Sequence, residues 1–162
     1  MMIEVPLSRG LVAIIDDADG PAVLAAGKWS ADVHDHTTYA RRSYVRTDRK
    51  RGWQRLHSFL TGWPLVDHVN GDGLDCRRIN MRSGTQSQNL ANRSASRNNT
   101  SGYKGVSFDR SRGSYQALIG VRGQRIALGR YADPIEAARA YDEAARHHFG
   151  EFARLNFPEE IR

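Results

Sequence analysis

The chain has 162 residues, of which 40% are hydrophobic and 26% charged, with 24 Lys and Arg residues against 18 Asp and Glu residues. This composition is typical of a globular protein, and the length suffices for one ordinary domain or two small ones. No apolar run approaches the ~18 residues of a membrane span, and the single cysteine, Cys76, excludes a disulfide framework and a cysteine-based zinc cluster.

The first part of the chain alternates between strand and short helix patterns. In chain order we expect a strand within 3–15, a helix within 16–26, strands at 29–33 and 39–45 around a polar turn at 34–37, and a helix at 53–60. The last of these rests on apolar side chains at helical spacing, and Gly62 and Pro64 end it.

The next stretch contains a short hairpin followed by a helix. Residues 65–69 form an apolar strand, and Asn70-Gly71-Asp72-Gly73 is a strong turn signal because Asn and Gly tolerate the left-handed conformation. A second strand is expected at 79–82. A helix over 86–92 follows, capped by Ser83 or Thr85.

A polar linker separates these elements from a second domain. Residues 93–101 contain no large apolar side chain, so a packed element there would have nothing to bury. We expect the elements beyond it to be strands at 102–106, 114–121 and 124–128, followed by a helix with Asp133 as N-cap, Glu136 completing a capping box and Gly150 at its end. The predicted domains are therefore 1–92, linker 93–101, and 102–162.

Positive charge is concentrated in two places. Residues 93–130 carry 8 basic residues against 1 acidic, whereas residues 131–162 carry 4 against 7. A second cluster lies within 41–55. These segments are either solvated faces or contact surfaces for a phosphate backbone. The basic residues of the second cluster that we predict to bind DNA are Arg41, Arg42, Arg46, Arg49, Lys50 and Arg51.

The hairpin and helix of residues 65–92 would bring together a carboxylate, an imidazole and two amides. Asp67 and His68 stand at a strand end, Asn80 on the returning strand and Asn89 on the helix. Carboxylate and amide oxygens suit Mg²⁺, and histidine suits proton abstraction from water near neutral pH. This chemistry fits hydrolysis of a phosphodiester.

The run RLHSFLTGWPLVDHVNGDGLDCRRINMRSGTQSQNLANR resembles the HNH homing endonucleases of phages and group I introns. The resemblance implies a ββα-metal fold with His68 as general base, Asn80 orienting it, and Asp67 and Asn89 binding one divalent metal ion, Mg²⁺ or Mn²⁺. His57 either supports this site or is a packed histidine. Cys76, Met81 and the Ser83-Gly84 segment depart from the family pattern.

The motifs of residues 101–158 resemble the APETALA-type (ethylene-response-factor) DNA-binding domain. They are Gly102-Tyr103-Lys104-Gly105-Val106, Leu128-Gly129-Arg130-Tyr131, Glu136–Asp142 and Leu155-Asn156-Phe157-Pro158. The resemblance implies a three-stranded antiparallel sheet on one helix, with DNA contacts at Lys104, Gly105, Arg125 and Tyr141. Base preference does not carry over, because this chain departs from the plant pattern at Ser107, Leu118, Gly120 and Ala127. The arginines that we predict to contact phosphate are Arg110, Arg112, Arg122 and Arg130.

Together these features predict an α+β protein that is a site-recognising, metal-dependent DNA endonuclease. The alternative is a DNA-binding regulator with an inactive nuclease domain, and a third possibility is an RNA-binding accessory protein of an intron. The expected partner is double-stranded DNA. We expect no membrane contact, no small-molecule cofactor, and a monomer or weak dimer. The N-terminus lacks a signal-peptide pattern, and the resemblance implies a phage or prophage gene product in the bacterial cytoplasm.

Overall fold

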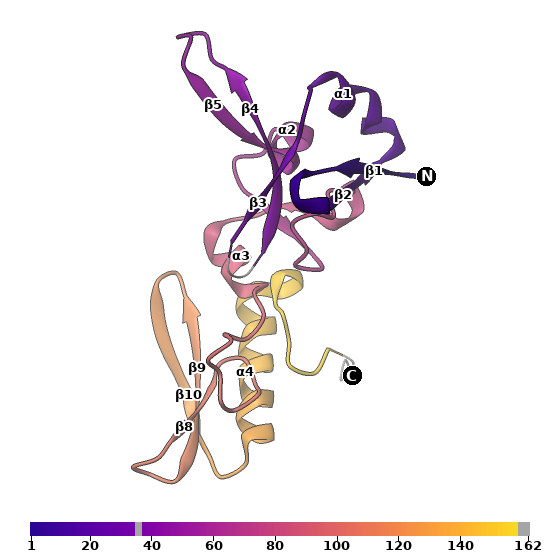
Figure 1. Ribbon diagram of the computed structural model, residues 1–162. Helices are drawn as coiled ribbons and strands as arrows, with labels where there is room; N and C mark the ends of the chain where they lie inside the picture. Colours follow the sequence, from indigo (N-terminus) through magenta and orange to yellow (C-terminus); the bar gives the residue numbers. More distant parts are fainter. Residues whose placement is uncertain (35–36, 159–162) are drawn as a thin grey trace. The chain divides into compact units, whose positions relative to one another are not determined.

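The computed structural model describes residues 1–34 and 37–158, which form two compact units, Met1–Gly84 and Thr85–Arg162. Asp35 and His36, within the predicted turn at 34–37, lie outside the described residues. The α+β class is confirmed, with four antiparallel sheets and short helices (Figure 1). Within the described ranges, no helix is both long and apolar enough to cross a membrane.

The described part of the first unit contains three sheets and short connecting helices. Its elements are β1 (Met2–Pro6), η1 (Ser8–Gly10), β2 (Val12–Asp16), η2 (Asp17–Asp19), α1 (Gly20–Ala25), β3 (Ser30–Val33), β4 (Thr38–Val45), β5 (Arg51–Arg55), α2 (Leu56–Thr61), β6 (Val66–His68), η3 (Arg78–Asn80) and β7 (Met81–Ser83). The sheets are β1-β2, β3-β4-β5 and β6-β7, all antiparallel.

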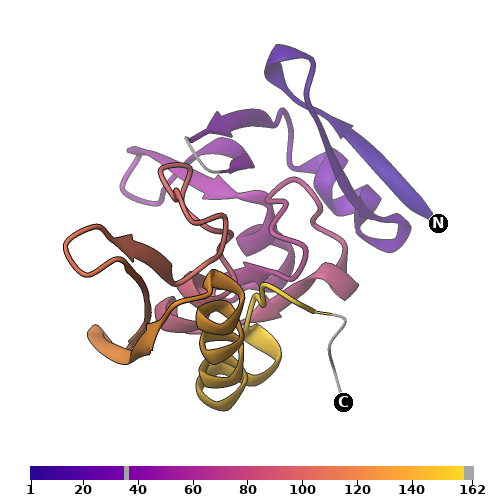
Figure 2. The same cartoon turned by 90° about the horizontal axis from the view of Figure 1, so that it is seen from below.

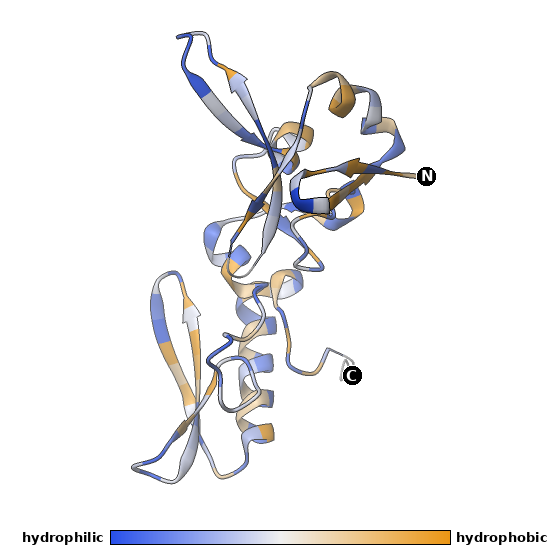
Figure 3. Ribbon diagram, viewed as in Figure 1, coloured by the Kyte–Doolittle hydropathy of each residue, from blue (hydrophilic) through white to orange (hydrophobic). Residues whose placement is uncertain are grey.

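Alternating apolar residues build the core of this unit. Val5, Ala13 and Ile15 point inward from the β1-β2 pair, and they pack with Val23 of α1 and Leu56 of α2. The region expected to hold one strand over 3–15 is thus a hairpin of two strands. Figure 3 colours β1, β2 and α1 mostly hydrophobic, in keeping with their role in the core.

The expected helix at 53–60 is only partly correct. Residues 51–55 form β5, which pairs with β4 through Ser43 opposite Trp53, and the helix begins at Leu56. Strand pairing satisfies the backbone of this segment and leaves its side chains alternating between two faces. The helix ends as predicted at Gly62, whose φ of 69° is the left-handed cap conformation.

The second unit contains one sheet and one long helix. Its elements are α3 (Gln86–Ala91), β8 (Val106–Asp109), β9 (Ser114–Val121), β10 (Gln124–Tyr131), α4 (Pro134–Phe149) and η4 (Gly150–Phe152). The sheet order is β10-β9-β8, and Figures 1 and 2 show α4 running along one face of it. The predicted three-stranded antiparallel sheet on one helix is confirmed, but its first strand is misplaced: it was expected at 102–106, whereas β8 is Val106–Asp109 and shares only Val106 with that range.

Small residues allow α4 to lie close to the sheet. Ala137 and Ala138 pack with Val106 and Ala117, and Tyr141 packs with Ile119. Asp133 is the N-cap as predicted, but its carboxylate accepts the N–H of Ile135, and the expected capping box with Glu136 is not formed in the described contacts of this helix.

The division between the units falls before α3, not within the predicted linker at 93–101. α3 belongs to the second unit, and later segments of that unit hold its end. The carbonyl of Ala91 accepts hydrogen bonds from the Lys104 ammonium and from the Arg154 backbone N–H. Thr85 forms a capping box with Gln88, which settles the choice of cap left open by the sequence.

A buried carboxylate fixes the C-terminal segment. Asp142 on α4 is 1% exposed and accepts hydrogen bonds from the backbone N–H groups of Asn156 and Phe157 and from the Asn156 side chain. Asn156 in turn bonds both backbone groups of Lys104. The Asn156 side chain thereby connects Asp142 and the segment after α4 to the loop before β8.

We expect Asp142→Ala to destabilise the protein by roughly 3 kcal/mol, because three buried donors lose a charged acceptor. Glu143→Ala, which removes the exposed neighbouring carboxylate on the same helix, is the matched control. Urea unfolding measures both variants, and equal midpoints for the two would contradict this role of Asp142.

Candidate functional site

Two histidines and a tyrosine meet in the first unit at the end of β6. His68 ends β6 and His57 lies on α2, and their ring centroids are 5.1 Å apart. Tyr39 of β4 packs against both rings, at 5.2 Å from His57 and 5.9 Å from His68. Both histidines are buried, at 6% and 5% exposure. Three elements distant in sequence therefore build one aromatic cluster around the predicted base.

Burial dominates the protonation of both imidazoles. Burial, together with the neighbouring His68 and Arg55, lowers the pKa of His57 to about 3. Burial also lowers the pKa of His68, against the opposing effect of Asp67, Asp72 and Asp75. Both rings are consequently neutral near pH 7, which is the form in which an imidazole accepts a proton.

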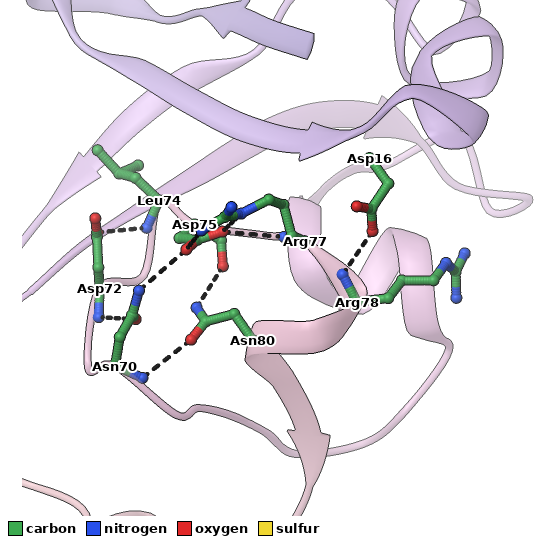
Figure 4. Close-up of polar contacts among 8 residues, drawn as sticks. All are labelled: Asp16, Asn70, Asp72, Leu74, Asp75, Arg77, Arg78 and Asn80. Carbon is green, nitrogen blue, oxygen red and sulfur yellow. Dashed lines mark hydrogen bonds and ion pairs between the residues drawn. The ribbon is translucent and has the colours of Figure 1, made fainter. Parts of the chain in front are cut away.

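Hydrogen bonds from side chains to backbone order the loop between β6 and β7 (Figure 4). The Asn80 carbonyl Oδ1 accepts the N–H of Asn70 at 3.0 Å, and its Nδ2 donates to the Asp75 carbonyl at 2.8 Å. The Asn70 Nδ2 donates to Asp75 Oδ2, and its Oδ1 accepts the N–H of Asp72. This network fixes the turn that follows His68.

The structure gives Asn80 a role different from the predicted one. Its described side-chain bonds hold the loop backbone, whereas the sequence predicted a hydrogen bond that orients the imidazole of His68. The sequence predicted Asn80 on the second strand of the hairpin. In the structure Asn80 is the last residue of η3, and the strand β7 begins one residue later, at Met81.

Asp75 and Arg77 strengthen the same loop. The Arg77 guanidinium donates to both carboxylate oxygens of Asp75 at 2.8 and 2.6 Å, and this hydrogen bonding lowers the pKa of Asp75. Arg78 anchors the next turn: its backbone N–H donates to Asp16, and its side chain to Asp19. The partners of Arg78 could not be predicted from the sequence, because Asp16 and Asp19 lie about 60 residues earlier in the chain.

Asp67, the predicted metal ligand, is buried on β6 and makes an ion pair within the unit. Its Oδ2 accepts from Nε and Nη2 of Arg82 on β7, each at 2.8 Å. The described ranges contain no group of three or more His, Cys, Asp or Glu side chains placed to hold a metal ion. A carboxylate still suits Mg²⁺, which keeps several waters and binds through one or two carboxylates together with substrate phosphate.

Asn89, the other predicted metal ligand, lies on α3 in the second unit. Asp67 and His68 belong to the first. The pairing of Asn89 with Asp67 therefore stays a prediction.

The sheet of the second unit exposes the face opposite α4. Ladder partners place Gly120 beside Arg125, and Ser107, Gln116 and Arg130 in one row across the three strands. Arg125 and Arg130 are exposed, and Asp109 holds the Arg130 guanidinium at 2.8 Å. The face therefore combines small side chains with arginines.

The turns beside this face carry the remaining predicted phosphate contacts. Arg110 and Arg112 are exposed in the β8-β9 turn, and Arg122 is exposed in the β9-β10 turn. Arg122 and Gly123 both have positive φ, 50° and 82°, the geometry of the tight turn that suits twisted strands.

Lys104, Gly105 and Tyr141 have packing roles in the structure. The Lys104 ammonium donates to the Ala91 carbonyl, and burial lowers its pKa to about 8. Gly105, with φ of 77°, lies so close to the ring of buried Tyr141 that a Cβ would overlap it. The residues at which the resemblance implies DNA contacts therefore make packing and hydrogen-bond contacts within the second unit.

The basic segment 41–55 divides between two faces. Arg42 faces inward: its guanidinium donates to the Ala26 carbonyl and to Gln54, and lies 4.8 Å from the ring of Phe59. Arg46, Arg49 and Lys50 lie in the exposed β4-β5 connection. Arg42 is therefore a packing residue, in contrast to its predicted DNA contact.

Comparison with known proteins supports the APETALA-type resemblance. The chain is 41% identical over 70 residues to dehydration-responsive element-binding protein 2A of rice, and 34% identical over 123 residues to dehydration-responsive element-binding protein 2C of Arabidopsis thaliana. These matches cover 42% and 70% of this chain. The chain spans only about a quarter to a third of the length of these plant relatives.

A phage protein is also similar. Protein 3.8 of Escherichia phage T7 is 26% identical over 103 residues, which cover 64% of this chain and 84% of the phage protein. No family model matches the chain. The names of these three relatives do not refer to a nuclease, so the endonuclease resemblance stays a prediction.

Burial of neutral His57 makes stability depend on pH. Because the pKa falls from 6.5 to about 3 on folding, the unfolded chain binds an extra proton between these values. We expect this group's contribution to be complete above pH 6.5 and to decline by about 1.4 kcal/mol per pH unit below it. Urea unfolding from pH 7 to 4 measures the slope. His57→Phe should reduce the slope without abolishing it, since burial also lowers the pKa of His68, and an unchanged slope in that variant would assign the acid sensitivity elsewhere.

Proposed function

We propose that the protein binds double-stranded DNA through the outer face of the β8-β9-β10 sheet. The observation that carries this proposal is the composition of that face, where exposed Arg125 lies beside Gly120 and exposed Arg130 shares a row with Gln116 and Ser107. A three-stranded sheet with few bulky side chains fits the width of the major groove, and arginine is the side chain that most often reads guanine there.

Charge separation within the second unit supports the same orientation. The strands and turns lie mostly in residues 93–130, which carry 8 basic residues and 1 acidic residue, whereas residues 131–162, which include α4 and its N-cap, carry 4 basic and 7 acidic residues. Phosphate attracts the first segment and repels the second. The similar plant proteins are named for binding a dehydration-responsive element, which agrees with recognition of a DNA site.

As a second activity we propose hydrolysis of a DNA phosphodiester at His68. The specific support is the cluster in which a neutral, buried imidazole follows the Asp67 carboxylate and the turn behind it is fixed by Asn80. In this proposal a ring nitrogen of His68 takes the proton of the attacking water. Neutral His57 and Tyr39 confine the His68 ring without adding charge.

A divalent ion fits this proposal through Asp67, with Asn89 as the predicted second ligand. When bound, such an ion would stabilise charge on the scissile phosphate and the leaving oxygen. Arg82 pairs with the same carboxylate, so the ion and Arg82 would share or exchange Asp67 Oδ2. Mg²⁺ is the expected ion, and Mn²⁺ the alternative.

The competing function is a DNA-binding regulator that does not cut DNA. The similarity to dehydration-responsive element-binding proteins favours it over the endonuclease, because it needs only the second unit's surface. DNA binding is common to both, so the cleavage test below separates them.

Arg125→Ala should weaken binding to a target duplex by roughly 10-fold to 100-fold, because a buried contact to a base edge is worth about 1–3 kcal/mol. Arg146→Ala removes the same charge from α4 and should change affinity little. Fluorescence anisotropy with duplexes selected from random sequence measures both variants. Equal losses would place the DNA surface elsewhere on this unit.

Supercoiled plasmid and phage genomic DNA test the hydrolysis. With Mg²⁺ the wild-type protein should convert plasmid to open-circular or linear form, and EDTA should prevent this. His68→Ala should lower the rate by about 100-fold or more, since it removes the general base. His147→Ala, which replaces an exposed histidine in the last turn of α4, is the control. Binding without conversion in any metal would support the regulator instead.

A further inference from the structure

We propose that the outward face of the β3-β4-β5 sheet is a second DNA-contact surface, located in the first unit and bound to the backbone of the duplex. This inference rests on the proposed DNA binding and extends that binding from the second unit to the first. We call this surface the Trp53 face, and its residues are Arg41, Arg51, Trp53 and Arg55.

Strand register puts these four side chains on the same side of the sheet. Arg41 pairs with Arg55, and Ser43 with Trp53, so alternate residues from both strands share one face. Burial along β5 follows this alternation: Arg51, Trp53 and Arg55 are exposed, while the two residues between them are half-buried. Arg42, one residue away from Arg41, faces the core side.

Contacts on this face hold the guanidinium groups in place. Asp32 of β3 pairs with Arg41 at 2.9 Å and lies 3.7 Å from Arg55. The Arg41 guanidinium lies 4.4 Å from the centre of the Trp53 ring, and that of Arg55 lies 4.5 Å from Tyr39. A guanidinium stacked on an aromatic ring keeps the N–H groups at its edge available for oxygen acceptors, and this planar fork matches phosphate oxygens as well as the Asp32 carboxylate.

The exposure of Trp53 is the observation that calls for a partner. Its residue surface is 57% exposed, on strands that Figure 3 colours mostly hydrophilic, and Val45 on the same face is 75% exposed. The part of a large aromatic side chain that stays exposed to water contributes no burial free energy to folding. It does gain on contact with a sugar or base beside a phosphate that the arginines hold.

Charge selects nucleic acid as the occupant. Three arginines face one carboxylate, Asp32, on this surface, so it carries a net positive charge. The face also leads to the predicted catalytic residues: Arg55 stacks on Tyr39, and Tyr39 contacts His57 and His68. DNA lying on the Trp53 face would therefore continue toward His68.

Tryptophan fluorescence of the full chain isolates this unit. All three tryptophans, Trp29, Trp53 and Trp63, lie in the first unit, with exposures of 6%, 57% and 38%. In a Trp63→Phe protein, Trp53 is the main residue open to a quencher. Anisotropy of a labelled DNA strand shows when the protein is saturated with duplex. At saturation we expect acrylamide to quench the fluorescence less than in the free protein, approaching the weak quenching of buried Trp29.

A matched pair of variants tests the arginines. Arg51→Ala should lower the slope of log affinity against log salt by about one, because one phosphate contact is lost. Arg9→Ala removes the same charge from η1, outside this face, and should leave the slope unchanged. Trp53→Ala should weaken binding roughly 10-fold, and circular dichroism of this variant checks that the fold is retained.

The outcomes separate this surface from the proposed function. If duplex DNA binds but Trp53 stays as accessible as in the free protein, the Trp53 face is not a DNA surface, and an acidic protein becomes the partner to seek. DNA binding through the β8-β9-β10 sheet would then still stand. If no duplex binds at all, both proposals are overturned.

Discussion

Buried polar side chains that bond to distant backbone hold the irregular segments of both units. In the first unit, Asn80 fixes the loop after β6; in the second, Asp142 fixes the segment after α4. Each replaces strand or helix pairing where the chain has neither, and so satisfies backbone groups that burial would otherwise leave without partners. Short elements of three to six residues can therefore present side chains in fixed positions.

The shortness of these elements also explains the burial and protonation of the predicted hydrolytic residues. β6 has only three residues, all buried, so Asp67 and His68 sit where water is scarce. The carboxylate is held by Arg82 and the imidazole stays neutral. A charged phosphate entering such a site must be compensated locally. In the proposed hydrolysis, Arg82 beside Asp67 is the cationic side chain placed to offer that compensation.

Local patterns made much of the fold predictable. The cap at Asp133, the alanine stripe of α4, the hairpin strands at 114–121 and 124–128 and the α+β class follow from periodicity and capping chemistry. Residues 53–55 were mispredicted because their helical spacing is also compatible with β5, and only pairing with β4 decides between them. Long-range pairing of this kind leaves no signal within a short window of sequence.

The candidate sites were less predictable, because a residue type does not reveal its partner. Arg41 and Arg42 are adjacent in sequence, yet one stacks on exposed Trp53 and the other donates to Ala26 inside the fold. Lys104 matches a family contact, but its ammonium is used by α3. Tyr39 carried no motif at all, and it contacts both histidines. Charge and motif identify the segment, whereas register decides which face each side chain occupies.

Two DNA surfaces on one chain would change how affinity is achieved. Each surface alone is small, and exposed arginine–phosphate contacts are individually weak and sensitive to salt. When one unit is bound, the other is kept at a high local concentration of DNA, so that two modest interactions multiply. Sequence recognition can then reside in the sheet of the second unit, while the Trp53 face needs only the phosphate backbone. This division removes the need for base contacts near His68, where buried, neutral side chains would make them costly.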